Sequence, residues 1–130
     1  MILGIGIDVV EIARVERMLD AKGERTRHRL FSDAEFAYAM ARAKPAQHLA
    51  VRIAAKEAAF KAFAGTQEAR AIGWREIEVI THEDGRPALV FHGRASSRAA
   101  ELGVTRAWLS LSHAEGTAVA VVVLESAQVG

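Results

Sequence analysis

Two acidic residues from distant segments carry the main chemical signal of this sequence. Asp8 ends the apolar N-terminal alternation in ILGIGIDVV, and Glu57 lies in the alanine-rich stretch RIAAKEAAFKAF. If folding brings them together, the two carboxylates form a hard oxygen site suited to Mg²⁺, which binds one or two carboxylates with water and substrate phosphates. The basic neighbours of Glu57, which are Arg52, Lys56 and Lys61, suit a phosphate-rich ligand. These residue types point to phosphoryl chemistry.

The charges around Glu57 also have a simpler interpretation. The apolar stripe of this helix consists of Leu49, Ile53, Phe60 and Phe63. Lys56 falls inside the stripe, while Glu57 and Lys61 lie one turn apart on its flank. They could form a solvated surface pair, with Lys56 extending past the aromatic rings to water. Alternatively, all three line a polar cleft in the core. Periodicity does not decide between these.

Asp8 has two interpretations as well. With Glu11 it forms a D-x-x-E pattern, which predicts a helix N-cap. It could instead be a metal ligand at the end of a strand. Gly4 and Gly6 lie on the same face of that strand and would leave room for a substrate. The two roles are compatible.

The N-terminal half predicts one strand followed by three helices. The expected elements are a strand at 2–10 and helices at 11–23, 31–45 and 47–63. Gly23 is expected to end the first helix, and a basic link follows it. Ser32 and Glu35 have capping-box spacing, and Pro45 is expected to end the second helix.

The C-terminal half predicts two hairpins separated by a short helix. The expected hairpin strands are 74–81 with 87–91, and 106–113 with 117–125, while the helix covers 94–103. Asp84 and Gly85 signal the first turn, and the last run is apolar enough for a central strand. This order predicts an α+β fold, with helices against a largely antiparallel sheet, in one domain spanning 1–130.

Composition excludes several classes of function. The net charge of +1 provides no global field for nucleic acid or a membrane surface, and the longest apolar run, at 118–124, is too short to span a bilayer. Cysteine is absent, which excludes disulfides, thiolate metal sites and thiol nucleophiles and favours a reducing cytoplasm. The sequence contains neither a Walker loop nor a dinucleotide fingerprint.

The histidines give a weaker signal. His113 ends a strand at a turn, where it could join Ser110 and Ser112 as a phosphate donor, although a turn histidine is more often incidental. The remaining histidines show no ligand spacing and are interpreted as structural or exposed: His28, His48, His82 and His92.

Four collinear strings resemble the holo-[acyl-carrier-protein] synthase family of small phosphopantetheinyl transferases. They are GIGIDVVEIARV, RIAAKEAAFKAF, DGRPALVFHG and LSLSHAEGTAVAVVV, and together they cover nearly the whole chain in the family's order. The resemblance implies transfer of the 4'-phosphopantetheine arm of coenzyme A to a serine of apo acyl carrier protein, with release of adenosine 3',5'-bisphosphate. It also implies a homotrimer with active sites between subunits.

The resemblance also implies residue roles. Asp8 and Glu57 match Mg²⁺ ligands, and Lys61 matches a lysine near the pyrophosphate. The positions that match coenzyme A-binding regions are Arg52, Asp84, Gly85, Arg86, Pro87, Ser112 and His113. The role of Lys56 stays open between a phosphate contact and an extended path to solvent. The base that deprotonates serine is either Glu57 or a metal-bound water.

Acyl carrier proteins are acidic, so Arg14, Arg17 and Arg25 are interpreted as a docking surface that steers the encounter. The same helix also carries Glu16 and Asp20, so an ordinary solvated face is the alternative. One departure from the family pattern is the Gly65-Thr66-Gln67 segment, where a second glycine is common. The competing hypothesis for the whole chain is a non-catalytic module that binds a nucleotide or a carrier protein.

Overall fold

The computed structural model describes residues 1–63 and 71–127, so the Gly65–Gln67 segment lies outside the described residues. The elements are β1 (Ile2–Glu11), α1 (Ile12–Leu30), α2 (Asp33–Met40), α3 (Pro45–Ala62), the 3₁₀ turn η1 (Trp74–Glu76), β2 (Ile77–Thr81), β3 (Pro87–Phe91), α5 (Gly93–Leu102), β4 (Arg106–Ala114) and β5 (Thr117–Glu125). Both sheets are antiparallel, with strand orders β1-β5-β4 and β2-β3. The predicted α+β class is confirmed.

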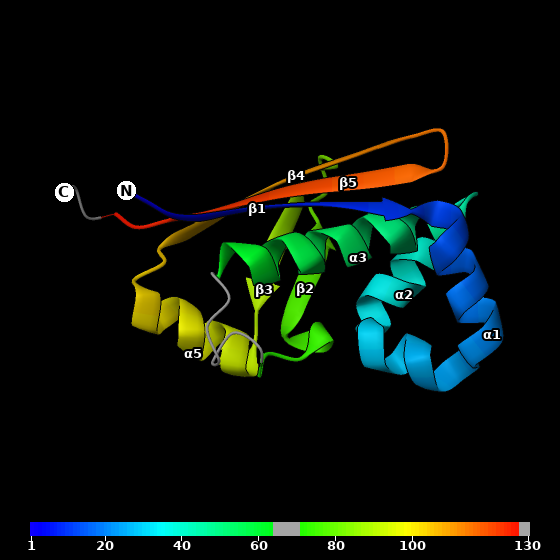
Figure 1. Cartoon of the computed structure of the whole chain (residues 1–130), viewed down its shortest axis with the longest axis horizontal. Coiled ribbons are helices and arrows are strands. Elements are labelled where there is room, and N and C mark those ends of the chain that lie inside the picture. The colour runs from blue at the N-terminus through cyan, green and yellow to red at the C-terminus, as the bar shows by residue number, and fades with distance from the viewer. Residues whose placement is uncertain (64–70, 128–130) are drawn as a thin grey trace.

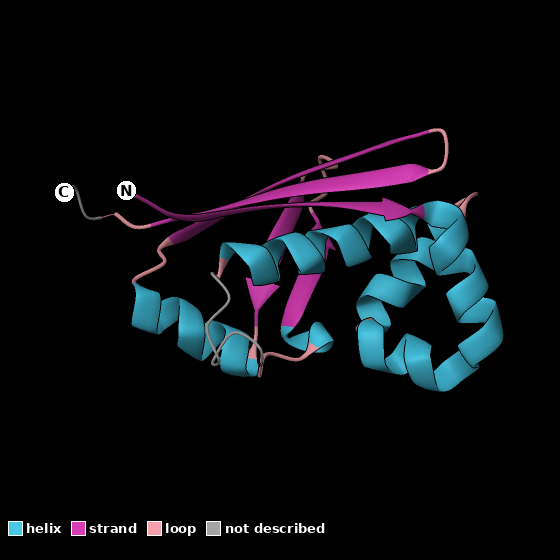
Figure 2. Cartoon of the chain, in the orientation of Figure 1, coloured by secondary structure: helices cyan, strands magenta, loops and turns pink. Residues whose placement is uncertain are grey.

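The three-stranded sheet buries one face against α3, which runs beneath it in Figure 1. The expected central strand, β5, lies between β1 and β4. Its alternate residues Ala118, Ala120, Val122 and Leu124 are fully buried, as the period of two along a strand requires. The β2-β3 hairpin crosses behind α3 in Figure 2, where β2 contacts α3 and β3 contacts β4, and α1 and α2 close one end. Helix α3 is therefore enclosed by other elements.

The space beside Gly4 and Gly6 is filled by helix α3, which corrects the expectation that these glycines leave room for a substrate. A Cβ atom at Gly6 would lie 1.8 Å from the carbonyl oxygen of Ala58, and one at Gly4 would lie 2.0 Å from that of Ala62. The backbone of α3 therefore packs directly on β1, at a distance that any side chain would prevent.

Two helix boundaries differ from the sequence prediction. Helix α1 continues to Leu30 through a kink at Gly23, whose φ is 66° and ψ is −151°. Glycine adopts this conformation without a steric penalty, so it redirects the helix where an end was expected. Pro45 begins α3 and does not end α2, because a proline in the first turn loses no hydrogen bond there. The capping box of Ser32 and Glu35 is confirmed.

The N-cap interpretation of Asp8 is wrong. Strand β1 continues past Asp8 to Glu11, and Glu11 occupies the N-cap position of α1 without a side-chain hydrogen bond. Asp8 instead pairs with Ala120 across the β1-β5 ladder. Its side chain therefore stands on the sheet face that α3 covers.

Within residues 1–63 and 71–127, no helix has the length and apolarity needed to cross a membrane.

Candidate active site

Asp8 and Lys61 meet where β1 crosses α3. The ammonium of Lys61 donates to Asp8 Oδ1 and to the carbonyl oxygen of Ile7, each at 3.0 Å. The Asp8 side chain is mostly buried at 18% exposure, whereas that of Lys61 is 55% exposed. Lys61 therefore pairs across the two elements, and not with Glu57 along its own helix as the surface-pair interpretation supposed.

Glu57 faces the same site. It lines a cavity of about 360 Å³ together with Asp8 and Arg14. Burial raises the pKa of Glu57, the neighbouring charge of Asp8 raises it further, and Lys61 partly opposes both effects. The two carboxylates that the sequence singled out are therefore close enough to repel each other.

This pair of carboxylates fits a hard divalent cation. Each lies on a rigid element, and both contribute oxygen ligands to one cavity. No cluster of three or more potential metal-ligating residues occurs in the part of the chain that the structure describes. A Mg²⁺ ion here would take its other ligands from water or substrate phosphates, which is its usual coordination in phosphoryl-transfer sites.

The other walls of the carboxylate cavity are mostly apolar, and sequence reasoning missed part of them. They consist of Val9, Val10, Val15, Met18, Leu30, Ile53 and Trp74. Trp74 was expected in a strand, but it lies in η1, where its ring makes an edge contact with Phe60 at 5.4 Å between centroids. Met18 lies three residues after the buried Val15, a spacing that could have indicated it.

A second cavity, of about 310 Å³, gathers five residues that were predicted to bind coenzyme A. They are Arg52 from α3, Gly85 and Pro87 from the β2-β3 turn region, and Ser112 and His113 from β4. These elements are far apart in the sequence. The cavity also includes Tyr38, His48, Thr81 and Ser110.

Arg52 is held rigidly at the wall of this cavity. It is 3% exposed, and its guanidinium donates to the His48 carbonyl oxygen at 3.0 Å and to Thr81 Oγ1 at 3.3 Å. The guanidinium also lies 4.5 Å from the centroid of the Tyr38 ring, and Arg42 lies 3.9 Å from that centroid. The buried Nε atom of Arg52 has no hydrogen-bond partner among the described residues. The cavity therefore presents a preorganised cationic wall.

His48 was expected to be structural or exposed, but it lines the second cavity. Burial lowers its pKa, and the positive charges of Arg52 and Arg42 lower it further. Tyr38 was not identified from the sequence at all. Its pKa is lowered chiefly by a hydrogen bond with Arg42. Helix periodicity does not reveal such a cluster, because its members come from different elements.

Asp84 and Arg86 form the turn beside the second cavity. Asp84 accepts hydrogen bonds from the backbone N–H of Arg86 at 3.0 Å and from its side-chain Nε at 2.7 Å. These bonds hold the pKa of Asp84 below its usual value. Both side chains are exposed, and of this turn the cavity lining includes Gly85 and Pro87. In this conformation Asp84 and Arg86 bond to each other.

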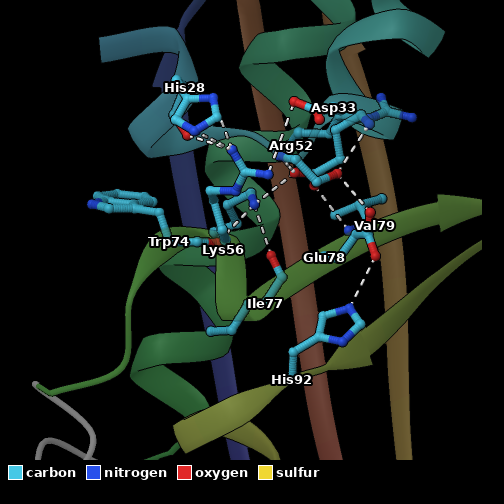
Figure 3. A network of polar contacts seen from close by, with 12 residues as sticks. His28, Asp33, Arg52, Lys56, Trp74, Ile77, Glu78, Val79 and His92 are labelled. Atoms are coloured by element: carbon cyan, nitrogen blue, oxygen red, sulfur yellow. Dashed lines mark hydrogen bonds and ion pairs between the residues drawn. The ribbon is translucent and has the colours of Figure 1, made fainter. Parts of the chain in front are cut away.

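The structure does not place Lys56 in either cavity, and it does not extend to solvent. Its side chain is fully buried, and its ammonium donates to Glu35 Oε1 at 2.8 Å and to the carbonyl oxygens of Trp74 and Ile77 at 2.8 and 2.7 Å. All three N–H donors are therefore used within the fold (Figure 3). Burial lowers the pKa of Lys56, and the Glu35 carboxylate opposes that shift. Lys56 therefore has neither expected role: it does not line a ligand cavity, and it does not extend to solvent.

Arg14, Arg17 and Arg25 are all exposed on α1. Arg14 lines the carboxylate cavity, and the acidic Glu16 and Asp20 are exposed on the same helix. Arg25 follows the kink at Gly23. The surface predicted for an acidic partner is therefore available on one bent helix.

Comparison with known proteins places these features in a family. The family model of the 4'-phosphopantetheinyl transferase superfamily matches residues 4–122. A holo-[acyl-carrier-protein] synthase from Thermus thermophilus is 49% identical over 97% of this chain and 95% of its own length. The crystal structure of the Neisseria meningitidis synthase has a TM-score of 0.85 and 33% identity, covering 97% of this chain and 100% of that one. The Bacillus anthracis synthase in complex with coenzyme A (3',5'-ADP) has a TM-score of 0.78 and 35% identity, covering 98% and 99%. The chain belongs to the 4'-phosphopantetheinyl transferase superfamily.

Proposed function

We propose that this chain transfers the 4'-phosphopantetheine arm of coenzyme A to a serine hydroxyl of an apo acyl carrier protein. The observation that carries the proposal is the cavity shared by Asp8 and Glu57, with Lys61 beside it, in a member of this transferase superfamily. The Thermus thermophilus relative is a holo-[acyl-carrier-protein] synthase, and the Bacillus anthracis structure is a complex with coenzyme A.

The reaction forms a bond between the serine oxygen and the β-phosphorus of coenzyme A and breaks the bond from that phosphorus to the bridging oxygen. The released adenosine 3',5'-bisphosphate keeps the electron pair. Such transfers depend on placement and charge neutralisation more than on a protein nucleophile. Lys61 is half-exposed beside Asp8, where it would stabilise charge on the leaving phosphate. The serine proton passes to Glu57 or to a water molecule.

Mg²⁺ would be held by Asp8 and Glu57. When bound, it neutralises charge on the pyrophosphate and on the transferring phosphoryl group. The proposal is supported by the chemistry of the donor set: two carboxylates face one cavity, and the pKa of Glu57 is raised by burial and by the charge of Asp8, which Lys61 only partly offsets.

Coenzyme A would occupy the second cavity with its nucleotide half. Arg52 and His113 would supply cationic or donor groups, and Ser112 would supply a hydroxyl, while Gly85 and Pro87 allow close approach of the ligand. Asp84 and Arg86 would act through the shape of their turn. The preorganised guanidinium of Arg52 supports this role, because its orientation is already fixed by its neighbours.

The exposed arginines of α1 would dock the acidic carrier protein. Arg14 lines the carboxylate cavity, and Arg17 and Arg25 are exposed on the same helix. A carrier bound along α1 would bring its serine to Asp8 and Glu57. Long-range attraction of this kind acts mainly on the association rate and weakens as salt increases.

The outer face of the three-stranded sheet would contact two further copies of the chain in a homotrimer. Its large apolar residues are more than half exposed: Ile5 62%, Ile7 56%, Val9 61% and Trp108 51%. They adjoin the outward-facing Val119, Val121 and Val123 of β5, which pair with them across the ladders. A continuous apolar face of this kind marks an interface. We also propose one domain spanning 1–130 that acts in the cytoplasm in fatty acid biosynthesis.

The test is to incubate the purified protein with apo acyl carrier protein, coenzyme A and Mg²⁺ and to measure the mass of the carrier. We expect the mass to increase by one phosphopantetheine, the increase to require Mg²⁺, and Glu57→Ala to abolish it. Glu101→Ala, an exposed acidic position on α5, is the matched control and should transfer normally. A carrier of unchanged mass, or equal transfer by Glu57→Ala, would support the alternative of a non-catalytic binding module.

A further inference from the structure

Lys56 and Glu35 form an ion pair whose side chains are both 0% exposed, a rare burial for charged groups. Glu35 Oε1 accepts from Lys56 and from the Ser32 N–H, each at 2.8 Å, and Glu35 Oε2 accepts from the Val79 N–H at 2.9 Å. With the two carbonyl contacts of Lys56, every charged donor and acceptor is satisfied. Figure 3 shows this network between α2, α3, η1 and β2.

Stability is a weak explanation for such a pair. Removing two charges from water costs free energy that their mutual attraction often only balances, and apolar residues of similar volume frequently serve as well. Buried apolar residues such as Ile77 and Val79 lie beside the pair, which also bonds to the backbone of both residues. The contribution of the pair is geometric, because five hydrogen bonds fix the orientation of α3 relative to α2, η1 and β2.

A fixed orientation matters at this position because the opposite side of α3 packs through small residues. Its contact with β1 is made by alanines such as Ala58 and Ala62 against Gly4 and Gly6. Small side chains allow close approach, but they interdigitate little and therefore resist rotation or sliding of the helix poorly. The buried pair adds a second constraint on α3, beside the bonds of the half-exposed Lys61 to Ile7 and Asp8.

The constrained elements carry the walls of the carboxylate cavity. Glu57 follows Lys56 directly on α3, and Trp74, whose carbonyl oxygen accepts from Lys56, lines the same cavity as Asp8. Arg52 has separate tethers to His48 and Thr81, so the second cavity depends less on the pair. We propose that Lys56 and Glu35 are positioning residues that fix Glu57 and Trp74 relative to Asp8. This inference rests on the proposed function only for its effect on catalysis.

The test replaces both charges with apolar or neutral groups of similar size, in the variant Glu35→Gln/Lys56→Met. It uses a Trp108→Phe background, in which Trp74 is the remaining tryptophan. We expect the variant to fold with a lower Tm, because the buried carbonyl oxygen of Ile77 loses its donor and a glutamine has one acceptor oxygen for the two N–H groups that Glu35 serves. Its kcat should fall by about 10- to 100-fold, the loss that a misplacement near 1 Å produces, while KM for coenzyme A changes less than about threefold. Acrylamide quenching of Trp74 fluorescence should change as well.

Leu124→Val is the matched control, because it loosens a fully buried position of β5 that lies outside the network. It should lower Tm and leave both kcat and Trp74 quenching as in the parent. The proposal is overturned if the double variant keeps kcat within about twofold of the parent, or if it fails to fold, which would make the pair a requirement for stability. If the parent itself transfers nothing, the proposed function fails, while unchanged Trp74 quenching still overturns the positioning role and altered quenching supports it.

Discussion

Replacing Gly6 by alanine tests whether β1 and α3 must touch for the site to form. The new Cβ atom would lie 1.8 Å from the Ala58 carbonyl oxygen, 2.8 Å from its carbon and 2.9 Å from the Ala62 nitrogen. All three are backbone atoms, so no side-chain rotation relieves the clash. Since Cβ contacts under 3.0 Å are essentially never observed, α3 must retreat from β1 by about 1.2 Å.

That retreat has two measurable consequences. Overpacking of this kind costs about 1 to 3 kcal/mol, which lowers the Tm of a chain of this length by about 4 to 12 °C. The retreat also separates Asp8 on β1 from Glu57 and Lys61 on α3. A displacement near 1 Å reduces phosphoryl transfer by about 100-fold. Thermal unfolding and kcat/KM, measured well below Tm, check both values.

Two further variants make this prediction sharp. Gly103→Ala strains a residue with φ of 81° in open space, at a similar cost of about 1 to 2 kcal/mol, and should leave kcat/KM unchanged. Adding Ala58→Gly to Gly6→Ala should not restore activity, because the clash is with the backbone. Normal Tm and kcat/KM in Gly6→Ala would refute the proposed contact between the two elements.

Two other predictions concern charge and assembly. Glu57→Gln should abolish transfer and raise Tm near neutral pH. The pKa of Glu57 is raised above 4.5, the ordinary pKa of a glutamate. The folded state therefore loses stability as the pH rises from 4.5 through the raised pKa, and this part of the pH dependence of Tm should vanish in the variant. If the parent and Glu57→Gln show the same dependence of Tm on pH, then burial and Asp8 do not destabilise the ionised form of Glu57. Ile7→Lys places a charge on the outer sheet face and should convert a trimer to monomers in light scattering, whereas Glu101→Lys should not.

Sequence analysis succeeded where the signal is local. The capping box of Ser32 and Glu35, the turn at Gly85 and the alternation of β5 each depend on residues a few positions apart, and each is confirmed. Local signals misled where one residue type serves opposite purposes. Pro45 suits the first turn of a helix as well as the residue after one, and Gly23 suits a kink as well as an end.

The site residues that lie in the family's sequence strings were predictable, whereas those that depend on contacts between elements were not. The family's strings identified Asp8, Glu57 and Lys61, and the structure brings them together. Tyr38 and Trp74 were missed because their roles depend on which elements become neighbours, and no spacing within the chain records that. The partner of Lys56 was missed likewise, since Glu35 lies on a different helix.

The geometry of α3 explains why an alanine-rich helix carries four charges and little solvated surface. At about 100° per residue, Arg52 and Lys56 point within about 40° of each other, and so do Glu57 and Lys61, while the two pairs diverge by about 100° or more. The first pair faces β2, where it contacts Thr81 and the Ile77 carbonyl oxygen. The second faces β1 and Asp8. One rigid helix that contacts both sheets therefore fixes the distance from the cationic wall of one cavity to the carboxylates of the other.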